Sequence, residues 1–376
     1  MLQKLFFILL VIHLVACSPS SETKQEAVKE TPKELGYAKR FAIKKTSEYT
    51  ILEILGDKES NRVTATFILY KQQKPNYNKD AYYIKIPVTK VASMSSIYTT
   101  MIDELNSINT IVAIDNVDYY NNTLIKEKVK NHTISELSKG PSIEVEKTLA
   151  LQPDLLLTFG MGNPKNDVDQ KLVQANLPIA ISLDHLEETP LARAEWIKFV
   201  ACFFDKETLA DSLFSVTEKN YNQLKTLTES VATKATVLTE IKYGDAWYVP
   251  SGKSYIANLL KDAGANYFWA NESNSGSIPL SFETVYAKAK DCDFWINLYN
   301  VNTRKDLTQY DSRYTLFKAY KNGNLYNNNK IQNENGYSNY WETGITHPDA
   351  ILKDLISIFY PQLLPNQALS YYKKIN

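Results

Sequence analysis

The pattern of apolar and polar residues changes near residue 88 and divides the chain into two kinds of segment. Before this point, three stretches alternate apolar and polar residues, are rich in β-branched and aromatic side chains, and are separated by polar turns. Such alternation is typical of strands in an antiparallel sheet. We therefore predict a small β extension over residues 36–87, with strands at Arg40–Leu55, Arg62–Lys71 and Ala81–Pro87.

After Val88, short apolar runs alternate with stretches of helical periodicity. Because strands that alternate with helices form parallel sheets covered on both faces, we expect an N-terminal α/β lobe over residues 88–189 and a C-terminal one over residues 231–376. The predicted strands are Val88–Ser93, Ile111–Ile114, Leu155–Phe159, Ile179–Ser182, Thr236–Ile241, Asn266–Trp269 and Phe294–Leu298. The predicted helices are Ser96–Leu105, Glu144–Ala150, Asp167–Ala175, Tyr255–Ala263, Phe282–Ala289, Arg313–Lys321 and Pro348–Phe359.

Residues 190–230 connect the two lobes and contain no Gly and only an initial Pro. Apolar residues recur there at helical spacing, which predicts one or two helices with a combined reach of about 60 Å. The lobes also repeat one motif, a helix that opens with Glu146 or Glu283 and leads through Asp154 or Asp293 into a strand. We therefore predict an α/β fold of two similar lobes with mainly parallel sheets, joined by a long rigid helix and preceded by the β extension.

The N-terminus has the features of a secretory signal peptide over residues 1–16. Lys4 precedes an apolar run at Leu5–Ala16 that is shorter than the about 20 residues of a membrane-spanning helix. Cys17 follows small residues, so we predict that it is lipidated and anchors the protein to a membrane in the periplasm. Residues 17–35 then have the composition of a flexible tether. A cleaved export signal with an incidental Cys is the alternative.

Composition excludes several functional classes. The 42 Lys and Arg residues balance the 42 Asp and Glu residues, so we expect no nucleic-acid partner. Cys202 and Cys292 lie among apolar neighbours, which favours buried thiols, although exported proteins can also form disulfides. No metal site is predicted, because the His residues after the signal are far apart in sequence, at His132, His185 and His347.

The motifs of known enzymes are incomplete in this chain. Gly252-Lys253-Ser254 resembles the end of a phosphate-binding loop, but Trp247 stands where that loop needs its first Gly. No Gly-x-Ser-x-Gly motif occurs, and the neighbouring carboxylates at Asp115 and Asp118 fit a solvated loop. We therefore expect neither an enzyme nor a cofactor, with a secreted α/β hydrolase-like enzyme as the alternative.

Aromatic side chains gather where several strands of the C-terminal lobe are predicted to end. Ligands of open α/β sheets bind at the carboxyl ends of the strands. Each aromatic residue taken singly fits a core or an ordinary surface, but together they predict a broad amphipathic wall for a large, partly apolar ligand. The predicted ligand-binding residues are Tyr243, Trp247, Trp269, Tyr299, Tyr337, Tyr340 and Trp341.

One run is more specific than the aromatic pattern. Residues 148–157 read TLALQPDLLL and follow Gly140-Pro141-Ser142 and Glu146. This run resembles the signature of substrate-binding proteins of ABC importers for iron chelates and cobalamin. Further matches to this family span about Val88 to Leu364 and occur in order at Lys90–Ser93, Ile111–Ile114, Gly252–Ser254, Leu259–Asn266 and His347–Pro361.

The resemblance implies two lobes that clamp an iron complex (siderophore or haem) or cobalamin and deliver it to an ABC permease dimer with its ATPase. It also implies that Glu146 and Glu283 dock to basic residues of the permease, whereas on the residues alone each would merely complement a helix dipole. We expect a lipid-anchored monomer. The chain has only five Arg residues, which favours a neutral or bulky ligand over a highly charged chelate. A surface interaction protein without a transport partner is a further alternative.

Overall fold

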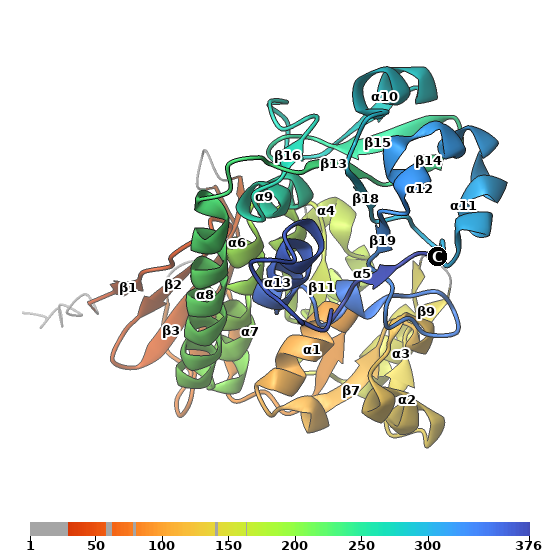
Figure 1. Ribbon diagram of the computed structural model, residues 1–376. Helices are drawn as coiled ribbons and strands as arrows, with labels where there is room; N and C mark the ends of the chain where they lie inside the picture. The colour runs from red at the N-terminus through yellow and green to blue at the C-terminus, as the bar shows by residue number, and fades with distance from the viewer. Residues whose placement is uncertain (1–28, 58–61, 78–79, 140–141, 163) are drawn as a thin grey trace, which may run out of the picture.

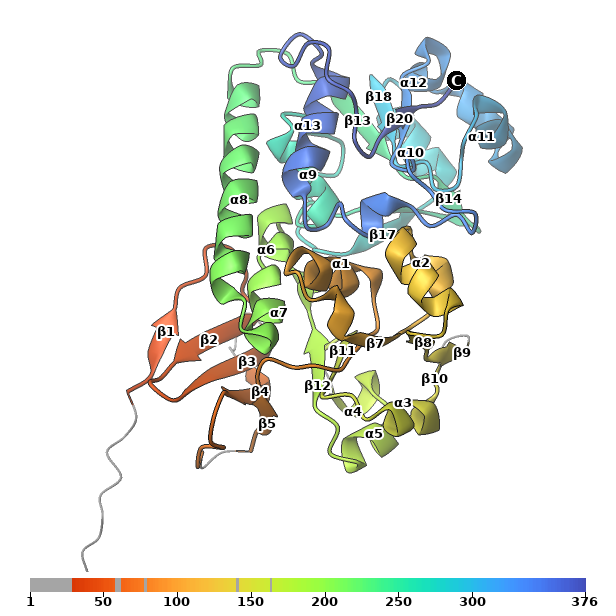
Figure 2. The ribbon, with the colours of Figure 1, turned by 90° about the horizontal axis from the view of Figure 1, so that it is seen from below.

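The computed structural model describes residues 29–57, 62–77, 80–139, 142–162 and 164–376. The predicted signal peptide, Cys17 and most of the predicted tether lie outside the described residues. The chain forms two α/β lobes, a set of linking helices beside them, and a β sheet near the N-terminus (Figures 1 and 2). This arrangement confirms the predicted fold class.

The N-terminal lobe is built on a five-stranded parallel sheet with the strand order β12-β11-β6-β7-β8. Its strands are β6 (Val91–Ser93), β7 (Ile111–Ile114), β8 (Ser135–Glu136), β11 (Leu155–Phe159) and β12 (Ile179–Ser182). The helices are α1 (Ser96–Glu104), α2 (Thr123–Lys130), α3 (Val145–Leu151), α4 (Pro164–Asp167) and α5 (Gln170–Gln174). Helix α2 and the small antiparallel pair of β9 (Ser138–Lys139) and β10 (Ser142–Ile143) were not predicted.

The C-terminal lobe has a second sheet of order β16-β13-β18-β19-β20, parallel except at β20. Its strands are β13 (Thr236–Thr239), β16 (Asn266–Tyr267), β18 (Phe294–Ile296), β19 (Leu325–Asn327) and β20 (Lys373–Lys374). Its helices are α9 (Tyr255–Asp262), α10 (Phe282–Ala289), α11 (Arg304–Tyr310), α12 (Lys318–Asn322) and α13 (Pro348–Phe359). An unpredicted antiparallel sheet joins β14 (Lys242–Tyr243), β15 (Ala246–Pro250) and β17 (Ser277–Leu280).

The two lobes repeat one capping interaction at the sequence echo. In the N-terminal lobe, Asp154 precedes β11 and accepts hydrogen bonds from the backbone N and Oγ1 of Thr89, at 2.8 and 2.9 Å. In the C-terminal lobe, Asp293 precedes β18 and accepts the same two bonds from Thr236, at 2.9 and 2.8 Å. In both lobes the carboxylate fixes the chain at the start of the neighbouring strand, so the lobes share local architecture as well as topology.

The segment between the lobes, predicted as one or two helices, contains three: α6 (Pro190–Ala194), α7 (Ile197–Phe204) and α8 (Glu207–Glu229). Asp205 has a left-handed φ of 55° and separates α7 from α8. Only α8 is long, at about 35 Å for its 23 residues. It runs beside both lobes and packs against α7 and α13 (Figure 2). Helix α8 is therefore the rigid connection.

The β extension is a five-stranded sheet in which β1 to β4 are antiparallel and β5 runs parallel to β4. Its first strand, Thr31–Lys33, lies within the segment predicted as tether. The predicted strand Arg40–Leu55 is divided by a turn at residues 46–48. The other strands are β2 (Phe41–Lys45), β3 (Tyr49–Asp57), β4 (Arg62–Tyr70) and β5 (Tyr82–Lys85).

Two buried carboxylates hold the extension on the N-terminal lobe. Glu195 accepts hydrogen bonds from the backbone N atoms of residues 36, 37 and 38, at 2.8 to 2.9 Å. Glu187 accepts from the backbone N atoms of Lys39 and Arg40 and from the indole of Trp196, at 2.9 to 3.3 Å. Because five consecutive amides are fixed in this way, the extension is a rigid part of the molecule.

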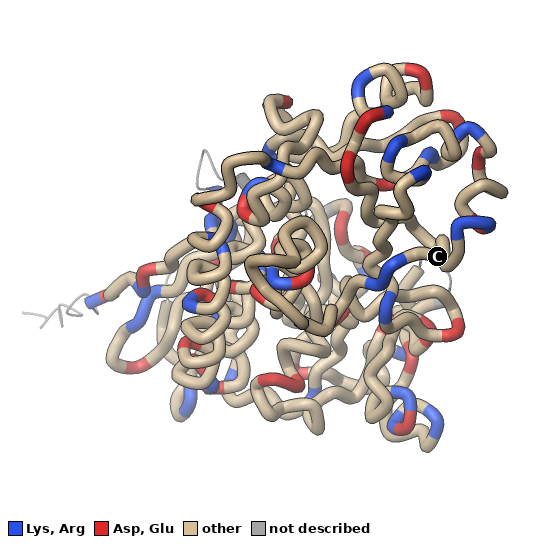
Figure 3. Tube along the Cα trace, viewed as in Figure 1, with Lys and Arg blue, Asp and Glu red and all other residues tan. Residues whose placement is uncertain are grey.

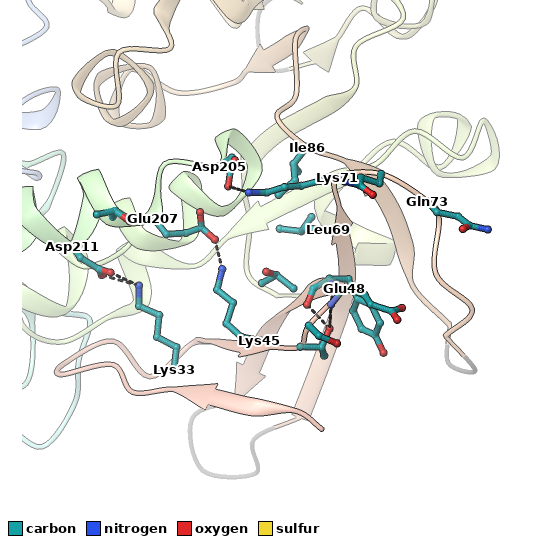
Figure 4. A pocket seen from close by; sticks show the side chains of 16 residues that line it. Lys33, Lys45, Glu48, Leu69, Lys71, Gln73, Ile86, Asp205, Glu207 and Asp211 are labelled. Atoms are coloured by element: carbon teal, nitrogen blue, oxygen red, sulfur yellow. Dashed lines mark hydrogen bonds and ion pairs between the residues drawn. The ribbon is translucent and has the colours of Figure 1, made fainter. Parts of the chain in front are cut away.

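A groove of about 800 Å³ lies between the extension and the start of α8 (Figure 4). Lysine side chains of the extension reach across it to carboxylates at the end of α7 and in α8. These ion pairs are Lys33–Asp211, Lys45–Glu207 and Lys71–Asp205. Because each of these lysines has a carboxylate partner, the ion pairs across the groove form a second attachment of the extension to the helices.

Charged residues of both signs are mixed along the two lobes and the extension (Figure 3), in keeping with the balanced charge of the chain. In the part of the chain that the structure describes, no helix has the length and apolar character that membrane crossing requires. Cys202 and Cys292 are buried free thiols, and burial raises the pKa of each to about 12. The two thiols are therefore not joined in a disulfide, which the sequence alone did not decide.

Candidate ligand-binding cleft

Residues that follow the parallel strands line two cavities, one within the N-terminal lobe and one between the two lobes. Met94 follows β6, Asp115 follows β7 and Phe159 ends β11 in the N-terminal lobe. His185 follows β12, and Glu240 follows β13 in the C-terminal lobe. The carboxyl ends of strands in both lobes therefore contribute to these cavities, as the fold class leads one to expect.

The first cavity, which we call the N-lobe cavity, has a volume of about 570 Å³. Its lining combines the apolar side chains of Met94 and Phe159, the ring of Tyr119, and the carboxyl group of Asp115. Phe159 is 56% exposed, although it is a large apolar residue. An exposed Phe beside polar groups is typical of a surface that binds a partly apolar molecule.

The second cavity, which we call the hinge-side cavity, has a volume of about 480 Å³ and is lined by both lobes and the β extension. The extension contributes Arg40, and the N-terminal lobe contributes His185 with Arg193 of α6. The C-terminal lobe contributes the start of α9 and Trp341. The rings of His185 and Phe159 lie 6.3 Å apart, so the two cavities adjoin at this pair of side chains.

Hydrogen bonds join the lobes at the side of the cleft away from α8. The buried Glu342 of the C-terminal lobe accepts from the backbone N atoms of Asn121 and Asn122 at the start of α2, at 2.6 and 3.2 Å. The rings of Tyr119 and Tyr337 also meet across the lobes, with centroids 4.8 Å apart. The structure is therefore a form in which the lobes touch at this edge.

Two carboxyl groups that line the cavities, Glu240 and Asp115, have raised pKa values. Burial raises the pKa of Glu240 to about 7, with a weaker opposing effect from Asn297. Burial also raises the pKa of Asp115 to about 6, against the hydrogen bond that Tyr120 donates to it. Among the described residues, no group of three or more His, Cys, Asp and Glu side chains gathers to hold a metal ion.

Three of the predicted ligand-binding aromatic residues belong to the core, and for them the prediction is wrong. Trp247 is fully buried, and its ring lies 5.5 Å from that of Trp295 while its indole donates to Thr239 O at 3.1 Å. Trp269 and Tyr340 are buried as well. Their positions near strand ends were correct, but their side chains point into the lobe.

The other four predicted residues are exposed, but the structure does not bring them together. Trp341 lines the hinge-side cavity and is 45% exposed. Tyr337 stands at the touching edge of the lobes, opposite Tyr119. Tyr243 and Tyr299 are exposed and line neither cavity, so their role in binding stays a prediction.

Sequence reasoning missed most residues that line the cleft. Phe159 had a usable signal, since it is an apolar residue at the predicted end of a strand. Tyr248 lines the hinge-side cavity from β15, within the antiparallel sheet that was not predicted. Arg40 and Arg193 had no signal, because they lie far from each other in sequence and outside any motif.

The two predicted docking residues occupy equivalent places in the lobes. Glu146 is in the first turn of α3 and Glu283 is in the first turn of α10, with side chains 87% and 73% exposed. Each has a cation beside it, Lys171 at 3.8 Å from Glu146 and Arg313 at 3.0 Å from Glu283. The geometry leaves both carboxylates accessible to a partner.

Comparison with known proteins assigns this architecture. Residues 91–330, more than half of the chain, match the model of a family described as periplasmic binding protein. The chain belongs to the periplasmic binding protein family. It is thus a binding protein rather than an enzyme, and the resemblance seen in the sequence is confirmed. The matched region begins after the β extension, which is an addition to the family's common part.

Among curated proteins, the chain is similar to two uncharacterized lipoproteins of Methanocaldococcus jannaschii. One is 24% identical over 303 residues, which cover 78% of this chain and 70% of the relative. The other is 24% identical over 316 residues, which cover 80% of this chain and 77% of the relative. The periplasmic binding protein family and these relatives place the chain among extracytoplasmic proteins.

Several solved structures share the fold at low sequence identity. A periplasmic solute-binding protein of Veillonella parvula aligns with a TM-score of 0.58 at 15% identity, and the alignment covers 76% of this chain and 85% of that protein. The vitamin B12-binding protein BtuF of Vibrio cholerae aligns with a TM-score of 0.53 at 14% identity, covering 75% of this chain and 99% of BtuF. The haem-binding protein HutB of Vibrio cholerae aligns with a TM-score of 0.54 at 17% identity, covering 70% of this chain and 98% of HutB. The two-lobe fold is therefore shared across proteins that bind different solutes.

Proposed function

We propose that this chain is a lipid-anchored substrate-binding protein that captures an iron complex (siderophore or haem) or cobalamin and delivers it to an ABC importer. The observation that carries the proposal is the pair of adjoining cavities at the carboxyl ends of the strands, one in the N-terminal lobe and one between the lobes. Exposed aromatic side chains line them, chiefly Phe159, Tyr248 and Trp341. Such a surface suits a large ligand with flat or apolar parts.

Protein purified from the producing cells provides the direct test of the ligand class. Haem and corrinoids absorb visible light, and native mass spectrometry reports the mass of any retained molecule. Co-purification of an iron chelate, haem or a corrinoid in a 1:1 complex is the expected result. A peptide or sugar in the cleft would contradict the proposed ligand class while leaving the binding function in place.

The anchor is tested by Cys17→Ser. This variant is expected to fold normally and to leave the membrane fraction, because lipid chains on Cys17 are the proposed attachment. A salt wash separates lipid anchoring from electrostatic adsorption. A Cys17→Ser protein that remains with the membrane after this wash contradicts the lipoprotein assignment.

Docking to the permease is tested by Glu146→Lys combined with Glu283→Lys. A two-fold permease presents the same basic patch to each lobe, so equivalent glutamates at α3 and α10 suit it. The double variant is expected to abolish uptake of the ligand in cells while ligand affinity and thermal stability stay near those of the parent. Glu127→Lys with Glu272→Lys, two exposed positions elsewhere, is the matched control. Normal uptake by the docking variant would mean that these glutamates only complement the helix dipoles.

A further inference from the structure

We propose that the hinge-side cavity is an anion-binding site for a carboxylate or phosphate group, and that the β extension takes part in it through Arg40. The inference rests on the proposed function insofar as the anionic group is part of the transported ligand. It goes beyond that function because Arg40 lies outside the part of the chain that matches the family.

Arg40 supplies a positive charge that no carboxylate neutralises by direct contact. Its guanidinium donates to two carbonyl oxygens, Leu186 O through Nε at 3.3 Å and Gly56 O through Nη1 at 3.1 Å. Among the described residues, its Nη2 has no hydrogen-bond partner and its side chain forms no ion pair. Held by carbonyls alone, the guanidinium keeps donors for an anion in the cavity.

The backbone of Arg40 is fixed as firmly as its side chain. Its N atom donates to Glu187 at 3.0 Å, and its carbonyl accepts from Leu55 N at 2.8 Å. The first bond attaches it to the N-terminal lobe and the second to β3 of the extension. Arg40 is therefore placed by the packing of the sheet on the lobe, and it needs little reorganisation to meet a ligand.

Arg193 brings a second guanidinium to the same cavity. It is 7% exposed, with Nη2 at 3.2 Å from Asp184 and the guanidinium carbon 5.0 Å above the ring of Tyr255. Its buried Nε atom has no hydrogen-bond partner among the described residues. A buried donor without a partner is costly, and an anion in the cavity would satisfy it. Two of the five Arg residues of the chain thus line one cavity.

The start of α9 adds backbone donors. Ser254 caps this eight-residue helix by accepting from Ala257 N at 3.2 Å, and Ser254, Tyr255 and Ile256 all line the cavity. Within the described residues, the N–H groups of Tyr255 and Ile256 have no hydrogen-bond partner. Unpaired first-turn amides and the helix dipole favour an anion at this place.

Carboxylates offset only part of these charges, because Asp184 pairs with Arg193 whereas the guanidinium of Arg40 contacts carbonyl oxygens. Glu187 is held by two backbone amides and the indole of Trp196, which all donate to its Oε1. Glu240 is largely protonated below neutral pH, because burial raises its pKa to about 7. The cavity therefore keeps an excess of donors over acceptors, and the small number of Arg residues in the chain no longer argues against an anionic ligand.

Isothermal titration of the full chain with citrate and with inorganic phosphate tests the site and separates the two classes of anion. Uncharged trimethyl citrate is the matched probe without charge. We expect saturable binding of at least one anion and none of the ester. Arg40→Gln should weaken anion binding about tenfold, the scale of one charge-assisted hydrogen bond, whereas Arg62→Gln in the same extension should not.

A second pair of variants does not depend on how Arg40 supports the fold. Ser277 lies on the exposed rim of the cavity, so Ser277→Asp should weaken anion binding by charge repulsion, and Ser277→Asn should leave it unchanged. Melting temperatures confirm that each variant is folded. The proposal is overturned if neither anion binds, or if Arg40→Gln and Ser277→Asp both bind anions as the parent does.

Parallel titration with haemin, cyanocobalamin and the molecule recovered from cells separates this inference from the proposed function. If one of these ligands binds in the cleft and the anions do not, the anion site is wrong and the transport function stands. If the anions bind through Arg40 and none of the three ligands binds, the anion site stands and the proposed ligand class fails.

Discussion

His347 Nε2 lies 3.0 Å from Glu104 Oε1, so an ion pair connects the start of α13 in the C-terminal lobe with the end of α1 in the N-terminal lobe. Thr346 donates to the same oxygen at 2.8 Å. The hydrogen bond that His347 donates to Glu104 raises the pKa of His347 above its ordinary value, although burial opposes it. Protonation of one imidazole therefore strengthens the contact between the lobes.

The first prediction concerns the pH dependence of this contact. Because the folded pKa of His347 is raised, its stabilising effect is complete below the ordinary pKa of about 6.5 and is lost as pH rises through the raised value. His347→Gln should reduce the fall in unfolding free energy between about pH 6 and 8, as urea titrations would show. Glu104→Gln should have the same effect, and the double variant should add little. An unchanged pH slope in both single variants would contradict the coupling.

The second prediction concerns Glu240, whose pKa is raised to about 7 by burial. The unfolded chain ionises this carboxyl near pH 4 to 5, so folding loses stability as pH rises from there to about 7. Glu240→Gln should be more stable than the parent at pH 8 by on the order of 2 to 3 kcal/mol, and similar to it at pH 4. Glu272→Gln, an exposed control, should show no such difference. A Glu240→Gln protein that is less stable than the parent at pH 8 would contradict the prediction.

The third prediction concerns Trp247 and Trp341, which were both predicted from the sequence to bind the ligand. Trp247→Ala should lower the unfolding free energy by about 3 to 5 kcal/mol, because it empties a buried site against Trp295 and Tyr314. Trp341→Ala should change stability little and weaken ligand binding by about 1 to 3 kcal/mol. Chemical unfolding and titration of the ligand recovered from cells measure the two effects. Equal ligand affinity in Trp341→Ala and the parent would remove Trp341 from the site.

The fourth prediction concerns the attachment of the extension. Burial disfavours the charge of Glu195, yet hydrogen bonds from Lys198 and three backbone amides outweigh it and lower its pKa. Glu195→Ala leaves those amides and Lys198 without their acceptor and should destabilise the protein by about 3 to 5 kcal/mol. Hydrogen exchange should rise in residues 36–40 first. Glu229→Ala, at the end of α8, is the control, and equal protection of residues 36–40 in both variants would contradict the role of Glu195.

The sequence predicted the elements that depend on local pattern. Helix α13 has its predicted bounds, Pro348–Phe359, because its apolar face is long, Pro348 begins it and Pro361 follows its end. The sheet of β14, β15 and β17 was missed, because its strands are only two to five residues long and two of them contain a Pro, at Pro250 and Pro279. Such short runs interrupted by Pro carry little strand signal.

The site was harder to predict than the fold. Position at a strand end says where a residue lies but not where its side chain points, and for this reason Trp247 was assigned to the cleft and found in the core. The hinge-side cavity combines Arg40, Arg193 and Trp341 from three parts of the molecule. Such a combination depends on how the extension and the lobes pack, which the pattern of a single sequence does not contain.

The attachment of the β extension also constrains how such chains can diverge. Glu187 and Glu195 are both buried, and most of their hydrogen-bond donors are amides of residues 36–40. A descendant that lost the extension would leave both carboxylates without these five backbone donors, unless both positions also changed. Gain or loss of this sheet is thus a concerted event. The residues that a relative has at the positions of Glu187 and Glu195 should therefore indicate whether it carries the β extension that lines the hinge-side cavity.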